Sequence, residues 1–202
     1  MTGFDEKILR KKKNFFAPEV KVIELNGKRV LRKDYGTKLA SFLVKHEGNI
    51  LKQLGGIKGI PALVKVHDSI LETEYIEGDV LAKFKPNQLS EDVYNRLCKV
   101  VNQMHKHGVV HLDLRQRKNI IIAKDGSPYL LDFANAIYAK NALRPIFEFL
   151  RAVDKSALIK LKNRYFPKLI TDEDRKFLKS FAFWRRLWLF KPLKLRAKDK
   201  VW

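Results

Sequence analysis

The segment from residue 109 to residue 136, VVHLDLRQRKNIIIAKDGSPYLLDFANA, decides how the rest of the chain is interpreted. A polar loop that holds Asp113 is followed by two short apolar runs, which an Asp-Gly pair at 125–126 joins as a tight turn. Asn119 opens the first apolar run, and Asp132 follows the second. A strand–turn–strand unit of this kind brings Asn119 and Asp132 together at one end of a hairpin.

These polar groups are the ones that phosphoryl transfer needs. One carboxylate must orient an acceptor hydroxyl and take its proton. An amide and a second carboxylate must hold magnesium against the phosphates, and a nearby cation must balance the charge of the transferred group. Asp113, Asn119 and Asp132 supply the first three groups, so the segment indicates a phosphotransferase.

The segment also resembles the catalytic core of the protein-kinase-like superfamily. Residues 111–114 (HLDL) look like its catalytic-loop signature, and residues 132–134 (DFA) look like its metal-binding Asp-Phe-Gly. By this resemblance Asp113 is the catalytic base, and Asn119 and Asp132 hold Mg²⁺. Arg115 is expected to stabilise the charge of the γ-phosphate, and His111 to support the loop by hydrogen bonding. The resemblance implies ATP and Mg²⁺ as cofactors.

The amino-terminal half contains a run that resembles the kinase strand whose lysine contacts the α- and β-phosphates, at residues 30–33 (VLRK). Strand alternation places Lys33 on the nucleotide side and Arg32 on the opposite face, which favours Lys33. Glu47, on the predicted helix that follows, occupies the place of the glutamate that pairs with this lysine in kinases.

Residues 72–78 (ETEYIEG) resemble the kinase hinge. The resemblance implies that the backbone of Glu74 and Ile76 bonds adenine and that Thr73 stands at the back of the pocket. The resemblance to kinases as a whole covers residues 19–136, about two thirds of the chain.

The remaining pattern agrees with an α+β, two-lobed, protein-kinase-like fold, with a small antiparallel-sheet N-terminal lobe and a reduced helical C-terminal lobe. We expect one domain over residues 1–202, divided into lobes at about 17–78 and 79–202. The predicted strands are 19–25, 28–35, 62–67, 69–76, 119–123 and 129–131, and the predicted helices are 37–54, 91–107, a stretch from 143 onward and a basic aromatic helix at 172–191. Ser90 is a candidate N-cap, and Thr171 with Asp174 resembles a capping box.

The chain departs from ordinary protein kinases in several places. Five residues separate Asp113 from Asn119, where kinases have four, so the loop must accommodate one more residue. No glycine-rich phosphate loop is visible, and the predicted 26–27 turn offers only Asn-Gly. Ala134 replaces the glycine of Asp-Phe-Gly, and no Ala-Pro-Glu follows. The parts that dock peptides in ordinary protein kinases therefore have no counterpart in this pattern.

Three groups of reduced kinases share this outline: lipopolysaccharide core kinases that phosphorylate heptose or 3-deoxy-manno-octulosonic acid, RIO-type atypical kinases, and small kinases of tRNA-modification complexes. The run from 111 to 122 looks most like the lipopolysaccharide group. That resemblance predicts a lipopolysaccharide precursor as the acceptor and a cytoplasmic enzyme, peripheral at the inner membrane. The alternative is a RIO-like serine/threonine protein kinase.

The net charge of +20 implies an anionic partner. Aromatic and basic residues interleave from Phe177 to Arg196, which suits an anionic membrane surface. The same residues could instead pack on the helical lobe, or bind RNA. A non-catalytic RNA- or membrane-binding pseudokinase module is therefore the rival from another class. Cys98 is the only cysteine, which excludes an internal disulfide, and no apolar run is long enough to span a bilayer.

Overall fold

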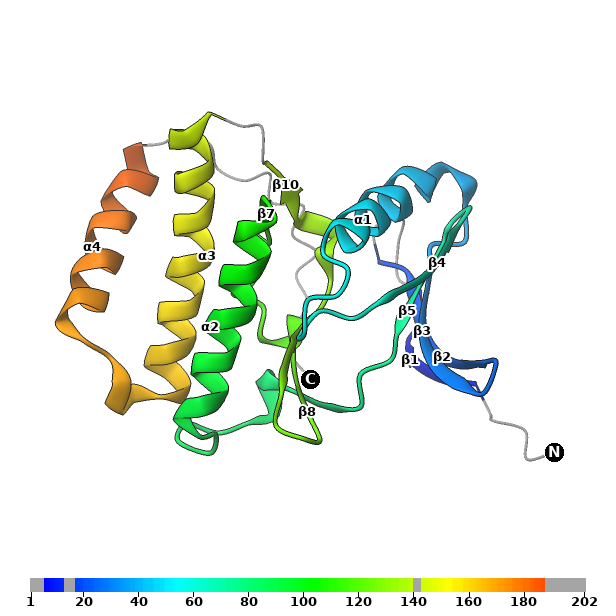
Figure 1. Ribbon diagram of the computed structural model, residues 1–202, viewed down its shortest axis with the longest axis horizontal. Helices are drawn as coiled ribbons and strands as arrows, with labels where there is room; N and C mark the ends of the chain where they lie inside the picture. The colour runs from blue at the N-terminus through cyan, green and yellow to red at the C-terminus, as the bar shows by residue number, and fades with distance from the viewer. Residues whose placement is uncertain (1–5, 13–16, 140–142, 188–202) are drawn as a thin grey trace.

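The computed structural model describes residues 6–12, 17–139 and 143–187. Within them the chain forms two parts, an antiparallel sheet with one helix and a group of three helices with short strands (Figure 1). The order of elements confirms the predicted α+β fold with a sheet lobe followed by a helical lobe.

The N-terminal lobe is built on a five-stranded antiparallel sheet with the strand order β1-β2-β3-β5-β4. Helix α1 packs on β4 and β5 and also reaches the C-terminal lobe through the turn at Phe133–Asn135. It therefore lies where the two lobes meet (Figure 1). The elements are β1 (Lys7–Arg10), β2 (Glu19–Leu25), β3 (Lys28–Asp34), α1 (Ser41–Gln53), β4 (Leu63–His67) and β5 (Ile70–Glu74).

The C-terminal lobe places α2, α3 and α4 side by side, with small sheets on the side of α2 that faces the N-terminal lobe (Figure 1). Strands β6, β8 and β9 form one sheet, and β7 pairs with β10. The elements are β6 (Gly78–Val80), α2 (Glu91–Lys106), β7 (Val109–Val110), β8 (Ile120–Ala123), β9 (Pro128–Leu130), β10 (Ile137–Tyr138), α3 (Arg144–Tyr165) and α4 (Asp172–Leu187).

Local sequence signals explain most of these elements. The β2–β3 turn has positive φ at both Asn26 (51°) and Gly27 (73°), which confirms the predicted tight hairpin. The capping box is confirmed, since the Thr171 amide donates to Asp174 Oδ2 and the Asp174 amide donates to Thr171 Oγ1. Ser90 precedes α2 but makes no capping bond with its side chain. Strand β1 (Lys7–Arg10) was not predicted, and it precedes the residues that were assigned to the N-terminal lobe.

A continuous apolar core joins both lobes. Leu54, Leu71, Met104, Leu130 and similar side chains are almost fully buried in one cluster that runs from α1 through α2 to β9. This shared core stabilises the position of one lobe against the other, because the apolar contacts do not stop at the lobe boundary. No helix among the described residues combines the length and apolar character needed to cross a membrane.

The predicted basic aromatic helix is described only up to Leu187, and the rest of the 172–191 range lies outside the described residues. At its start, Phe177 and Phe181 stack on each other at 5.8 Å between ring centroids, and Phe149 of α3 lies 5.9 Å from Phe181. Lys155 of α3 lies over the Phe177 ring. These two aromatic residues therefore pack on the helical lobe, which was one of the alternatives for this segment.

Candidate active site

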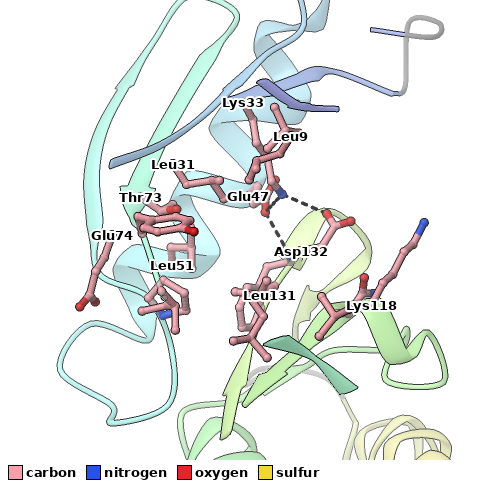
Figure 2. A pocket seen from close by; sticks show the side chains of 18 of the residues that line it. Leu9, Leu31, Lys33, Glu47, Leu51, Thr73, Glu74, Lys118, Leu131 and Asp132 are labelled. Atoms are coloured by element: carbon pink, nitrogen blue, oxygen red, sulfur yellow. Dashed lines mark hydrogen bonds and ion pairs between the residues drawn. The ribbon is translucent and has the colours of Figure 1, made fainter. Parts of the chain in front are cut away.

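A cavity of about 330 Å³ lies between the two lobes. The N-terminal sheet contributes Val20 and Leu31 to one wall, and the C-terminal lobe contributes Ile121 and Leu131 to the other. Figure 2 shows Lys33, Glu47 and Asp132 together at one end of this cavity, with Thr73 and Glu74 further along it. An apolar slot with charged groups at one end fits a molecule that has a flat apolar part and an anionic part.

Lys33 is the centre of the charged end. Its Nζ lies 2.7 Å from Glu47 Oε1 and 3.1 Å from Asp132 Oδ1. Burial alone would lower the pKa of Lys33, but the charges of Asp132 and Glu47 outweigh burial and raise it. In turn, the charge of Lys33 lowers the pKa of the Asp132 carboxyl. Both side chains are therefore held in their charged forms.

Strand register explains why Lys33, and not Arg32, reaches the cavity. Lys33 lines the cavity, whereas the Arg32 guanidinium lies 2.6 and 2.8 Å from Glu72 Oε1. Successive side chains of β3 point to opposite faces of the sheet, so the two cations are separated by the sheet itself. The structure thus places Lys33 and Glu47 together, where the sequence pattern put them.

The segment after β5 borders the other end of the cavity. Thr73, Glu74, Tyr75 and Ile76 all line it. Glu74 and Ile76 therefore lie where the hinge resemblance put them, at the end of the cavity away from Lys33. The backbone amide of Glu74 already donates to the Ala62 carbonyl at 2.8 Å.

Asp113 lies on the loop after β7, next to the cavity. Three side-chain amides point at its Oδ2: those of Gln116, Asn119 at 3.1 Å and Asn135 at 3.4 Å. Burial raises the pKa of the Asp113 carboxyl, and the hydrogen bonds from Asn119 and Gln116 oppose that rise. The amides fix one oxygen of the carboxylate, and a hydrogen-bonded carboxylate beside a cavity is suited to accept a proton. Gln116 and Asn135 were not predicted.

The loop that carries Asp113 is also held by Asp154 of α3, a completely buried carboxylate. Its two oxygens accept hydrogen bonds from the backbone amides of His111 and Leu112, both at 2.8 Å, and from His105 Nε2 at 2.9 Å. Leu112 has a φ of 65°, a conformation that non-glycine residues rarely adopt, and the bonds from Asp154 hold it there. Asp154 was not predicted, because no motif marks a residue that binds only backbone and a core histidine.

The predicted role of His111 in supporting the loop agrees with its contacts. Its Nε2 lies 3.0 Å from the Leu131 carbonyl, and its Nδ1 accepts from the Asp113 amide at 3.4 Å. His111 is completely buried. The ring therefore connects the Asp113 loop to the strand end that carries Asp132.

The stretch between Asp113 and Asn119, one residue longer than in ordinary kinases, ends in a 3-10 turn at Arg117–Asn119. The turn puts Lys118 on the cavity lining, whereas Arg115 is exposed and is not part of that lining. The structure thus does not bring Arg115 to the charged end of the cavity. Lys118, which was not predicted, is the cation of this loop that reaches it.

Asn119 and Asp132 fit a magnesium ion by the chemistry of their free oxygens. The side-chain nitrogen of Asn119 donates to Asp113, which leaves its side-chain oxygen Oδ1 available. The Leu131 backbone amide donates to the backbone carbonyl of Asn119, which sets Asp132 beside Asn119. Magnesium takes few protein oxygens and completes its shell with phosphates and water. The described residues contain no cluster of three or more His, Cys, Asp or Glu side chains suited to a metal.

Comparison with known proteins agrees with this geometry. A family profile described as "RIO1: RIO domain" matches residues 7–173. The fold resembles that of the Rio2 kinase-ADP/Mg²⁺-phosphoaspartate complex from Chaetomium thermophilum, with a TM-score of 0.60 and 12% identity, over 90% of this chain and 71% of that chain. At this identity the likeness concerns the fold, and it confirms a kinase-like architecture.

A curated relative is serine/threonine-protein kinase PknA of Nostoc sp. strain PCC 7120, which is 34% identical over 100 residues. The match covers 44% of this chain and 18% of PknA, so the chain spans less than a fifth of that relative. The comparisons support the RIO-type alternative, and they do not support the lipopolysaccharide branch that the sequence pattern favoured.

Proposed function

The chain belongs to the RIO domain family, and from this premise we propose that it is an ATP- and Mg²⁺-dependent kinase that phosphorylates a serine or threonine hydroxyl of a protein. The observation that carries the proposal is the ionic group formed by buried Lys33 and Glu47 with partly exposed Asp132 at one end of an apolar cavity, with Asp113 beside it. Charged groups whose pKa values are perturbed by specific partners beside a cavity are typical of functional sites.

The apolar part of the cavity would hold adenine. Val20 and Leu31 lie on one side and Ile121 and Leu131 on the other, so a flat ring would be covered on both faces. The backbone near Glu74 and Ile76 would bond the edge of the ring. Lys33, held by Glu47, would then meet the phosphates at the charged end.

The residues that would hold Mg²⁺ are Asn119 and Asp132. When bound, the ion would neutralise negative charge on the phosphates during transfer. Asp132 has a φ of 63°, a conformation that non-glycine residues rarely adopt and that is common at functional sites. The Asp132 carboxylate stays ionised because Lys33 lowers its pKa.

Asp113 would orient the acceptor hydroxyl and receive its proton as the O–P bond forms and ADP leaves. The three amides at its Oδ2 leave its other oxygen for the acceptor. Arg115, two positions after Asp113 in the chain, is exposed and adds a positive charge to this loop. This charge favours an acceptor with acidic surroundings.

The protein acceptor is supported by the family and by the name of the Nostoc relative, a serine/threonine-protein kinase. A sugar of a lipopolysaccharide precursor is the second candidate for the same chemistry. The two acceptors require the same donor site, so the cavity does not distinguish them.

The test supplies ATP labelled at the γ-phosphate, with Mg²⁺, to mixed cell protein and to extracted envelope glycolipid in parallel. Controls are chelation of the metal and the variant Asp132→Asn. Label in protein alone, lost in both controls, is the expected result. Label in glycolipid alone would replace the protein acceptor by the sugar. Bound ATP with no label in either pool would point to a pseudokinase.

A further inference from the structure

Ordinary protein kinases have a glycine-rich loop ahead of the strand that carries their phosphate-binding lysine. That loop covers the phosphates of ATP with backbone amides, which requires glycine because the backbone must come very close. Residues 11–18 read KKKNFFAP and contain no glycine. If ATP binds as proposed, its phosphates must therefore be covered by other groups.

The end of β1 shows an irregularity that changes the direction of a side chain. Ile8 pairs with Lys21 and Arg10 pairs with Val20, so two steps on β1 correspond to one step on β2. In a regular strand Leu9 and Arg10 would point to opposite faces of the sheet. Here both line the cavity, as a β-bulge permits. The bulge thus brings Arg10 to the cavity, whereas a regular strand would point it to the opposite face of the sheet from Leu9.

The Arg10 guanidinium is fixed but not neutralised. Its Nε donates to the Pro18 carbonyl at 3.2 Å, across the connection between β1 and β2. Among the residues that the structure describes, no carboxylate forms an ion pair with it. The two terminal nitrogens remain as donors. Its charge acts on Asp132, where it helps to lower the pKa of that carboxyl, so Arg10 belongs to the charged end of the cavity.

Lys118 approaches the same end from the other lobe. In Figure 2 Asp132 stands between Lys33 and Lys118. Lys118 lines the cavity, is exposed to solvent and forms no ion pair within the described part of the chain. It lies in the 3-10 turn Arg117–Asn119, directly before Asn119. Arg10 and Lys118, which have no carboxylate partner among the described residues, therefore face the cavity from opposite lobes.

We propose that Arg10 and Lys118 bind the phosphates of the nucleotide from opposite lobes and together take the place of the absent glycine-rich loop. The inference rests on the proposed function, because it concerns the same nucleotide. A guanidinium has the planar, two-pronged shape that matches a phosphate, and an ammonium acts as a point charge. Both interactions depend on the phosphates and not on adenine.

The test is equilibrium binding of adenosine, ADP and ATP, with Mg²⁺, to the full chain and to Arg10→Gln and Lys118→Gln. We expect each variant to bind ATP at least roughly tenfold more weakly, about the effect of one lost charge-assisted hydrogen bond. Adenosine should bind as it does to the unchanged protein. Arg10→Lys should recover part of the loss, since it keeps the charge but not the two-pronged shape.

The matched control is Lys7→Gln, which removes the same charge from the same strand at an exposed position outside the cavity. Thermal unfolding of each variant shows that the fold is kept. Unchanged ATP affinity in Arg10→Gln and Lys118→Gln, or an equal loss for adenosine and for ATP, would overturn this inference alone. If the unchanged protein bound no ATP, the inference and the proposed function would both be wrong.

Discussion

Two buried carboxylates, Glu47 in the N-terminal lobe and Asp154 in the C-terminal lobe, organise the two sides of the site in different ways. Glu47 Oε1 accepts from the Lys33 ammonium, which faces the cavity, and from the Phe133 amide at 3.0 Å. Asp154 accepts from two loop amides and a buried histidine, and none of these three partners is among the residues that line the cavity. Glu47 therefore serves the ligand side, and Asp154 serves the shape of the catalytic loop.

The comparison also explains why one carboxylate was predicted and the other was not. Glu47 pairs with a side chain that has its own motif, so the order of Lys33 and Glu47 in the chain points to both. Asp154 binds backbone amides, which every residue has, and it stands in the middle of an ordinary helical pattern. The role of Asp154 becomes visible only in the folded protein, where α3 packs against the loop at residues 111–112.

Truncating each carboxylate in turn should show the difference between them most clearly. Asp154→Ala leaves two backbone amides and His105 without their acceptor in the core, so we expect a loss of about 3–5 kcal/mol in the free energy of unfolding. Glu47→Ala should cost less, about 1–3 kcal/mol, because Lys33 keeps Asp132. Denaturant unfolding measures both values.

If Glu47→Ala lost as much stability as Asp154→Ala, the division into a ligand side and a structural side would be wrong. Asp154→Asn offers a milder change for the case in which Asp154→Ala is too unstable to purify. An asparagine replaces one acceptor oxygen by a donor that faces a donor, so a clear loss of stability is still expected.

The second prediction concerns binding. Glu47→Gln keeps the shape of the side chain but removes the charge that holds Lys33, so we expect ATP affinity to fall at least roughly tenfold with only a small change in stability. Glu24→Gln, on an exposed position of β2, is the control and should bind ATP normally. Normal ATP affinity in Glu47→Gln would remove Glu47 from the ligand side.

Much of the fold followed from local signals, and the exceptions have physical causes. The hairpin at 19–34 and helices α1, α2 and α3 could be predicted because turn residues and apolar periodicity mark them. Strand β1 could not, since it is four residues long and mostly exposed, so it carries little apolar pattern. It is recognisable as a strand only through its pairing with β2.

The site divides in the same way. Lys33, Asp113, Asn119 and Asp132 carry motifs, and the structure brings them together around one cavity and its adjoining loop. The path of the loop between Asp113 and Asn119 puts Lys118 on the cavity lining and leaves Arg115 outside it. Side-chain periodicity does not apply to such a loop, so counting residues from Asp113 did not point to Lys118.

A smaller effect is expected in the pH dependence of activity, through the pKa of Asp113. Burial raises the pKa of Asp113 above that of an ordinary aspartate, which is about 3.9. The Asp113 carboxyl therefore takes up a proton at a higher pH than an ordinary aspartate does. A base must be ionised, so activity should fall as the pH decreases through this raised value. Gln116→Ala removes a hydrogen bond that opposes the rise, so the acid limb of kcat/KM should move to higher pH.

The control for this shift is Gln103→Ala, an exposed change on α2 that should leave the profile unchanged. An acid limb that moves to lower pH in Gln116→Ala would contradict the expected direction of the pKa change. An unmoved limb would mean that Asp113 is not the group that limits activity at low pH.

The central claim is that the two sides have separate tasks, nucleotide binding around Lys33 and proton acceptance at Asp113. Its most direct test is Asp113→Asn, with ATP affinity and γ-phosphate transfer to the labelled acceptor measured on the same preparation. We predict nearly unchanged ATP affinity and transfer reduced at least roughly a hundredfold. Transfer at the rate of the unchanged protein would show that Asp113 is not the base and would contradict the account.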